Sequence, residues 1–339
     1  MSSFQKDNIS VAYPVDDPSA PSLDIAIYSH PQNTVKDEGG LKEFLYQLDW
    51  PVHLQTFFIQ ELNKAPIRYF VYDDSGSMSC TDGEKFINNE TISCSRWSEL
   101  CETMKFQVQA SCIGKIQTHF MFLNGQSYTT NEIINVEQTF QSMGNMTGGG
   151  TPLCRTLNKI IDQIRPMEQE LYSNGQKVSI MIATDGESSD GDVTIPLSIL
   201  KNMPVHITLR LCTNEKRIIN LWNNIDRNLE LSLDVIDGYC SEAAEVYSVN
   251  PWLCYGLPIH QIREYGISYV LFDHLDEITL TYEDQSKMYN IRQRSFTKET
   301  SFLSDIKNKP TICKYRFYRY CIYSKTRYSS FSKKSQKKR

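Results

Sequence analysis

The sequence predicts an α/β fold, a doubly wound and mostly parallel sheet with helices on both faces. Apolar segments of strand length alternate with helical segments between residues 67 and 248, which is the pattern of a parallel sheet covered by helices. Two of the apolar segments, 70–72 and 180–183, are continuously apolar, as strands buried on both faces are. Two others, 205–211 and 229–235, alternate apolar with polar residues, which favours strands near an edge with one wetter face.

The elements follow in a regular order. Residues 41–63 carry apolar side chains at helical intervals and are interrupted near Pro51, which predicts two short helices ahead of the first strand. The predicted strands are 67–72, 117–123, 177–184, 204–212 and 229–236, and the predicted helices are 95–113, 152–173, 193–202, 214–225 and 239–248.

The chain divides into five regions by composition. They are an extended or disordered leader (1–40), a helical extension (41–64), the main α/β domain (65–250), an accessory segment packed on it (251–310) and a basic, aromatic tail (311–339). Within the accessory segment, residues 267–272 are predicted to form another strand. That segment could supply a sixth strand, cover a sheet edge or form a small second domain, and no function is assigned to it.

The net charge of −5 hides a strong asymmetry. Residues 306–339 contain twelve Lys or Arg and no acidic residue, so the rest of the chain carries 23 basic against 40 acidic side chains. An acidic body with a basic tail fits no simple nucleic-acid-binding domain.

The first residues lack the apolar core of a secretory signal, and no run of eighteen apolar residues occurs. No Cys-x-x-Cys occurs among the ten cysteines, which argues against a zinc module. Cys101 and Cys112 share a helical face with apolar residues and are expected to be reduced core thiols, so we expect a cytoplasmic protein.

Hard oxygen ligands gather directly after the first strand. Asp73, Ser75 and Ser77 occupy one Asp-x-Ser-x-Ser turn. Carboxylate and hydroxyl oxygens are the ligands that Mg²⁺ and Mn²⁺ prefer in proteins. The alternative for this short pattern is a turn that Asp and Ser side chains cap, with no bound metal.

Two further segments carry the same chemistry. Gly148, Gly149 and Gly150 permit a close approach of the backbone, and Thr151 with the following proline begins a helix. The apolar strand ending at residue 184 runs into Asp185. Because the carboxyl ends of parallel strands lie at one edge of the sheet, where ligands bind in open α/β folds, the three segments are expected to meet there.

Taken together and in this order, the three segments resemble the von Willebrand factor A domain and its metal-ion-dependent adhesion site, over roughly residues 66–250. The resemblance implies that five side chains surround one divalent cation, Mg²⁺ or Mn²⁺, some of them through bound water. These are Asp73, Ser75, Ser77, Thr151 and Asp185. The Gly-Gly-Thr-Pro-Leu form of the second segment looks more like the intracellular and microbial branches of the family than like integrin domains.

The resemblance also implies a function. An acidic side chain of a protein partner would complete the coordination of the cation, and the positive end of the helix after Pro152 would favour that anion. A scaffold or complex-assembly subunit is therefore expected. We expect Asp74, Asp82 and Glu187 to form a partner-binding rim, within polar loops at 79–93, 125–135 and 187–193.

Other functions were weighed against this one. The basic and aromatic tail could bind nucleic acid or an anionic membrane. A phosphatase of the haloacid dehalogenase type would need a second Asp where Ser75 stands, and no P-loop lysine follows Gly150. No nucleophile–base constellation is evident, so the sequence indicates that the protein is not an enzyme.

Overall fold

The computed structural model describes residues 34–87, 90–145, 148–229 and 233–293. Their main feature is a six-stranded sheet in the order β5-β4-β1-β6-β7-β8. Five strands are parallel, and only the edge strand β5 is antiparallel. The strands are β1 (Arg68–Tyr72), β4 (Thr118–Phe122), β5 (Tyr128–Thr129), β6 (Val178–Thr184), β7 (Val205–Leu211) and β8 (Asp234–Ile236). The predicted doubly wound α/β architecture is confirmed.

Counted along the chain, these six strands lie in the order 3-2-1-4-5-6. The order reverses between β1 and β6, which pair in register from Arg68 opposite Ser179 to Tyr72 opposite Ala183. In open α/β sheets this reversal opens a crevice at the carboxyl ends of the strands. The turn after β1 and the turn after β6 both lie at that crevice.

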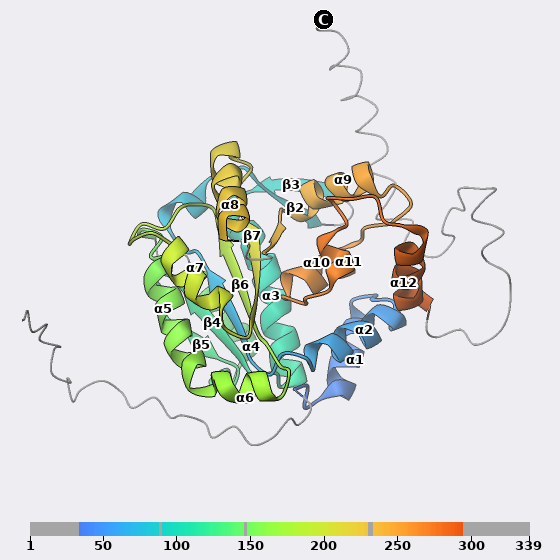
Figure 1. Cartoon of the computed structure of the whole chain (residues 1–339), viewed down its shortest axis with the longest axis horizontal. Coiled ribbons are helices and arrows are strands. Elements are labelled where there is room, and N and C mark those ends of the chain that lie inside the picture. Colours follow the sequence, from blue (N-terminus) through green and yellow to red (C-terminus); the bar gives the residue numbers. More distant parts are fainter. Residues whose placement is uncertain (1–33, 88–89, 146–147, 230–232, 294–339) are drawn as a thin grey trace, which may run out of the picture. The chain divides into compact units, whose positions relative to one another are not determined.

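Helices cover both faces of the sheet (Figure 1). Alternate residues of β1 enter different cores: Tyr69 and Val71 pack in one, Phe70 and Tyr72 in the other. The first core is covered by α5 (Leu153–Ile164), α7 (Thr194–Lys201) and α8 (Lys216–Leu229). The second is covered by α1 (Glu38–Gln47), α2 (Val52–Leu62), α3 (Arg96–Gly114), α4 (Val136–Met143), α9 (Tyr239–Val249), α10 (Leu257–Glu264), α11 (Val270–Asp273) and α12 (Tyr282–Gln293).

The two predicted helices before the first strand are α1 and α2. They pack through aromatic rings on the second core: Trp50, between them, stacks at 5.5 Å on Phe106 of α3, and Phe58 meets Tyr265 edge-on at 5.0 Å. Asp37 caps α1 by accepting a hydrogen bond from the Gly40 amide at 2.8 Å. The helical extension is thus part of the main core.

Several predicted boundaries were wrong. The helix predicted over 152–173 is divided at Arg165–Met167, where Pro166 supplies no backbone donor, and continues as α6 (Glu168–Ser173). Of the strand predicted over 229–236, Asp234–Ile236 form β8 and 230–232 lie outside the described residues. Leu229 continues the helical stripe of Ile218, Trp222 and Ile225 and belongs to α8.

The strand predicted over 267–272 is replaced by the short helix α11. Tyr269 and Phe272 both contact Phe57 of α2, at 5.2 and 5.6 Å between ring centroids. Residues three apart lie on opposite faces of a strand and on one face of a helical turn, so this packing selects the helix. The segment from α10 to α12 therefore covers the second core with helices.

The loop predicted over 79–93 forms a hairpin of β2 (Gly83–Ile87) and β3 (Glu90–Cys94). The polar face predicted for β7 is not wet, because Thr208 and Arg210 are buried. Residues 1–33 of the predicted leader and the basic tail, 311–339, lie outside the described residues. The end of the predicted leader is helical instead, because α1 begins at Glu38. No helix within the described part of the chain is long and apolar enough to cross a membrane.

A buried ion-pair network explains the polar residues of β7. Glu264 of α10 accepts hydrogen bonds from Arg210 Nε at 2.9 Å and from Thr103 Oγ1 at 3.0 Å, and His260 Nε2 lies 3.2 Å from it. Arg210 also pairs with Glu99 of α3. The network joins α3, β7 and α10 within the second core.

We expect this network to make stability depend on pH below neutrality. Burial alone would raise the pKa of Glu264, but His260 and Arg210 outweigh burial and lower it from 4.5 to about 2. The folded state therefore binds the proton less tightly than the unfolded chain. The resulting stabilisation, on the order of 3 kcal/mol, is complete above about pH 4.5 and is lost as the pH falls towards 2.

Urea unfolding between pH 7 and pH 3 measures this effect. The free energy of unfolding of Glu264→Gln should fall less over this range than that of the wild type. Glu170→Gln, an exposed position on α6, should keep the wild-type dependence. Equal slopes for Glu264→Gln and the wild type would contradict the assignment.

Candidate metal centre

The turn after β1 is shaped by Asp73. Its amide donates to the carbonyl of Ala183 at 2.9 Å, which continues the β1–β6 pairing beyond the strand. One carboxylate oxygen accepts from the Ser75 amide at 3.0 Å and the other from Thr184 Oγ1 at 2.6 Å. Burial raises the pKa of Asp73, and the hydrogen bonds from Ser75 and Thr184 offset part of that rise. Each carboxylate oxygen has more than one acceptor site, so this turn leaves Asp73 able to accept further bonds.

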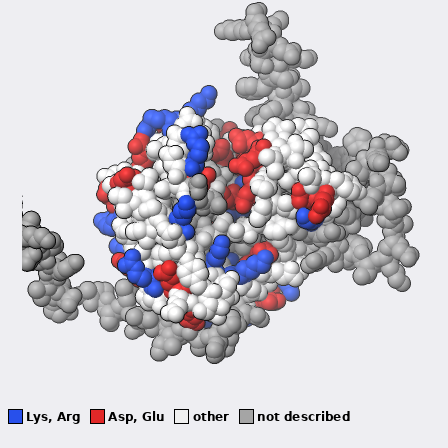
Figure 2. All heavy atoms as spheres, in the orientation of Figure 1, with Lys and Arg blue, Asp and Glu red and all other residues white. Residues whose placement is uncertain are grey.

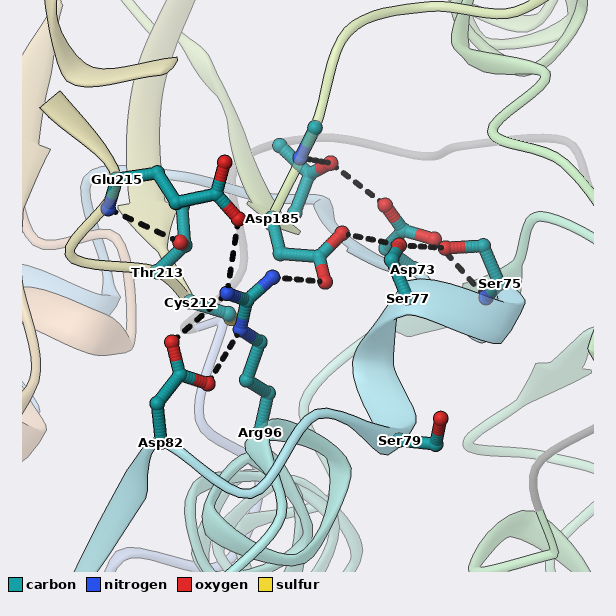
Figure 3. A network of polar contacts seen from close by, with 12 residues as sticks. Asp73, Ser75, Ser77, Ser79, Asp82, Arg96, Asp185, Cys212, Thr213 and Glu215 are labelled. Carbon is teal, nitrogen blue, oxygen red and sulfur yellow. Dashed lines mark hydrogen bonds and ion pairs between the residues drawn. The ribbon is translucent and has the colours of Figure 1, made fainter. Parts of the chain in front are cut away.

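Three oxygens converge beside Asp73 (Figure 3). Ser75 Oγ and Ser77 Oγ lie 3.1 Å apart, and Ser77 Oγ donates to Asp185 Oδ1 at 2.8 Å. Neighbouring oxygens of an octahedral Mg²⁺ site, with bonds of 2.0–2.1 Å, are about 2.9 Å apart. The two hydroxyls and one carboxylate oxygen therefore have the spacing of adjacent ligands. Ser79, in the same short helix η1 (Gly76–Ser79), points away from this group.

The glycine loop is held against the turn by its backbone. The Gly76 amide donates to the carbonyl of Gly149 at 3.1 Å, and the Gly148 amide donates to the carbonyl of Asp74 at 2.9 Å. Gly149 has φ of +108°, and a Cβ there would lie 2.9 Å from Asn124 Oδ1. Glycine is needed at this position for both reasons.

Thr151 follows this loop and lies beside Gly186. Its amide donates a hydrogen bond to Ser189 Oγ at 2.9 Å. Its Oγ1 would lie 3.9 Å from a Cβ built on Gly186, the residue after Asp185. All three predicted segments therefore meet at the carboxyl ends of β1 and β6.

Arg96, the first residue of α3, is the main feature that the sequence analysis missed. Its Nη1 lies 2.9 Å from Asp185 Oδ2 and its Nη2 lies 3.1 Å from Glu215 Oε1. Its Nε and Nη2 each lie 2.7 Å from an oxygen of Asp82. The arginine is only 4% exposed, so the positive charge is part of the site's interior (Figure 3).

Of the three residues predicted to form a partner-binding rim, one is buried and the other two are ion-paired. Asp74 is fully buried and does not belong to a rim: its Oδ1 accepts from the Asn124 amide at 2.8 Å and from Asn124 Nδ2 at 3.1 Å. Asp82 and Glu187 are exposed, but each is ion-paired, Asp82 with Arg96 and Glu187 with Arg217. Acidic side chains do gather between α8 and α9 on the face drawn in Figure 2.

The start of α5 is not open to an anion. Asp190 accepts hydrogen bonds from the amides of Cys154 at 3.0 Å and Arg155 at 2.9 Å, two of the free donors of the first turn. The positive end of this helix was expected to attract a carboxylate of a partner. Instead it binds the carboxylate of Asp190. Its carboxylate is a capping group, and the pKa of Asp190 is lowered because these hydrogen bonds and that of Ser188 outweigh burial.

The donor set fits a hard divalent cation. It offers the carboxylates of Asp73 and Asp185 and the hydroxyls of Ser75, Ser77 and Thr151, all oxygens. The positive charge of Arg96 repels a cation, but Arg96 contacts only the Asp185 oxygen that does not face Ser77. The residues present can therefore coordinate Mg²⁺ or Mn²⁺, with one oxygen of Asp185 for the metal and the other for Arg96.

No family model and no curated protein matches the chain. Among solved structures it is similar to BatB from Bacteroides thetaiotaomicron, at 14% identity over 52% of this chain and 92% of that one, with a TM-score of 0.35. It is also similar to an aerotolerance-related membrane protein from Bacteroides fragilis, at 16% identity over 43% and 66%, TM-score 0.30. A third similar structure is proximal thread matrix protein 1 of the mussel byssus, at 17% identity over 43% and 37%, TM-score 0.26.

We expect Arg96→Met to destabilise the protein by about 3 kcal/mol in the presence of a chelator, because the buried Asp185 would lose its positive partner. Millimolar Mg²⁺ should restore part of that loss, since the cation can take over the same carboxylate. Chemical denaturation with and without Mg²⁺ measures both effects.

Arg217→Met is the matched control. It removes the exposed partner of Glu187 and should change stability by about 0.5 kcal/mol or less. If Arg96→Met is no more destabilising than this control, Arg96 does not hold the site together.

Proposed function

We propose that the protein is a divalent-cation-dependent protein-binding module of the von Willebrand factor A kind, which captures an acidic side chain of a partner. The observation that supports this most is the group of Ser75, Ser77 and Asp185 oxygens, spaced as adjacent ligands at the point where the strand order reverses. Three separate segments supply these oxygens and Thr151. A turn that only stabilises itself needs no such convergence.

Charge supports capture of an anion. A divalent cation held by Asp73 and Asp185 would be neutralised by them alone, and the hydroxyl ligands add no charge. Arg96 already offsets part of the negative charge on Asp185, although it is shared with Asp82 and Glu215. The cation would therefore carry no excess of negative charge from its own ligands, and a carboxylate could bind by direct coordination in the position that faces solvent.

The roles of the residues follow from their positions. We assign Ser75 and Ser77 to bind the cation through their hydroxyls. Asp73 is held by Thr184 and the Ser75 amide, so we assign it to hydrogen-bond a metal-bound water or to bind directly. Mg²⁺ is the expected cation, with Mn²⁺ as the substitute of similar geometry.

The biological setting follows from the same proposal. A scaffold or assembly subunit needs a reversible contact with a partner and no chemical step, so we do not assign catalysis to the site. The cytoplasmic location expected from the cysteine pattern stays a prediction. The alternative, nucleic-acid or membrane binding through residues 311–339, concerns residues outside the described part, and no described contact favours it.

We expect Ser77→Ala to weaken Mg²⁺ binding by the full-length protein at least tenfold, because it removes a central oxygen ligand. Isothermal titration calorimetry measures the affinity, with Asp73→Ala as a second variant that should abolish binding. Ser79→Ala is the matched control: its hydroxyl bonds the carbonyl of Gly76 and points away from the group, so binding should be unchanged. Equal affinities for Ser77→Ala and Ser79→Ala would exclude this coordination.

A second experiment tests carboxylate capture directly. Mn²⁺ bound to the protein should enhance the relaxation of water protons, and N-acetyl-aspartate amide should reduce the enhancement by displacing a bound water. N-acetyl-asparagine amide, which has no negative charge, should have no effect. If both compounds act alike, or if Asp73→Ala responds as the wild type does, the site does not capture carboxylates through a cation.

A further inference from the structure

A second group of acidic side chains lies where β8, α9, α10 and α11 meet, partly within the segment 251–310, to which no function was assigned from the sequence (Figure 1). No residue of the candidate metal centre belongs to it. Its carboxylates are Asp234, Glu242, Glu245, Asp273 and Asp276.

One arginine occupies the middle of this group. Arg263 of α10 is fully buried, and its Nη2 lies 3.0 Å from Asp234 Oδ1 and 3.6 Å from Asp276 Oδ1. Its Nη1 pairs with Glu242 Oε1. Asp234, Glu242 and Asp276 are thus brought together around one guanidinium group, although they come from a strand, a helix and a turn.

The arginine does not satisfy the group. Asp234 is 4% exposed, and its Oδ2 is buried without any hydrogen-bond partner. Asp276 Oδ1 and Asp273 Oδ1 are also buried without a hydrogen bond. Buried polar atoms in folded proteins are almost always paired, and an unpaired buried carboxylate oxygen is costly. Arg263 Nε is buried without a hydrogen bond as well, so the arginine and these carboxylates do not satisfy one another, and a further positive ligand would pair the free carboxylate oxygens.

The geometry suits a cation of the size of Ca²⁺. One carboxylate oxygen each from Glu242, Glu245 and Asp276 lie within 4.8 Å of one another. Two oxygens that share a Ca²⁺ ion at 2.3–2.6 Å are at most about 5 Å apart, and Ca²⁺ accepts irregular arrangements of carboxylates. Glu242 and Glu245 are three residues apart in α9 and so project from one side of the helix.

We propose that Glu242, Glu245 and Asp276 bind a Ca²⁺ ion, with the unpaired oxygen of Asp234 completing the negative shell around Arg263 and the ion. The charge balance favours this arrangement, since Asp234, Glu242 and Asp276 pair with one arginine and Glu245 lies beside two of them.

The ion would have a structural role. β8 is the edge strand of the sheet and has only three residues, while α9 and the turn after α11 reach it from later parts of the chain. A cation shared by Glu242, Glu245 and Asp276 would link α9 to that turn and hold both over Arg263. Binding of Ca²⁺ should therefore stabilise the folded chain.

Native mass spectrometry of the full-length protein with Ca²⁺ tests the proposal. The double variant Glu245→Gln and Asp276→Asn keeps the shapes of the side chains and removes two charges. We expect it to bind one Ca²⁺ ion fewer than the wild type. This difference does not depend on the site at Asp73, which would contribute equally to both proteins.

Thermal unfolding supplies an independent readout. At a hundredfold excess over its dissociation constant, Ca²⁺ should raise the unfolding midpoint of the wild type by about 5 °C or more. Ca²⁺ bound at this site should not raise the unfolding midpoint of the double variant. In the presence of a chelator the double variant should be more stable than the wild type, because two like charges have been removed.

A matched control uses two exposed acids far from the group, Glu137→Gln and Glu170→Gln, on α4 and α6. This control should bind as many ions as the wild type and respond equally to Ca²⁺. The proposal is wrong if the Glu245 and Asp276 double variant keeps the wild-type ion count, or if the control loses an ion to the same extent.

Discussion

Parallel pairing between β1 and β6 is the contact on which the candidate metal centre depends. The two strands are buried along their whole length and stay in register from Arg68 to Tyr72, and the Asp73 amide extends the pairing by one more hydrogen bond to Ala183. A shift of one residue would turn every side chain of β1 to the other face of the sheet. The separate cores on the two faces prevent such a shift, so Asp73 and Asp185 leave the sheet side by side.

Buried arginines determine the electrostatics on the side of the sheet covered by α3 and α10. Arg96 binds carboxylates at the candidate metal centre, Arg210 joins Glu99 and Glu264, and Arg263 lies among the carboxylates near β8. A buried ion pair contributes little net stability, because removing both charges from water costs about as much as their attraction returns. These pairs therefore act mainly by fixing which loops and helices approach one another.

The two acidic groups differ in how completely they are paired. At the candidate metal centre, each oxygen of Asp73 and Asp185 accepts a hydrogen bond from a hydroxyl, an amide or Arg96. Around Arg263, carboxylate oxygens of Asp234, Asp273 and Asp276 are buried with no hydrogen bond. The first group is satisfied as a hydrogen-bonded network, which agrees with the reversible cation proposed for it. The second leaves carboxylate oxygens unpaired, which agrees with the structural ion proposed there.

The sequence by itself determined the sheet class, the five parallel strands and the three segments of the candidate metal centre. These depend on local patterns: an apolar strand running into Asp73, a glycine loop before Thr151, and a second apolar strand running into Asp185. It did not determine the β2–β3 hairpin, the burial of Asp74, or the approach of Arg96 to Asp185. Those depend on contacts between residues far apart in the chain, and so does the meeting of Glu242 with Asp276 at Arg263. Polar residues with no periodic pattern acquire their partners only when the helices pack, so only the tertiary structure decided where the charges lie.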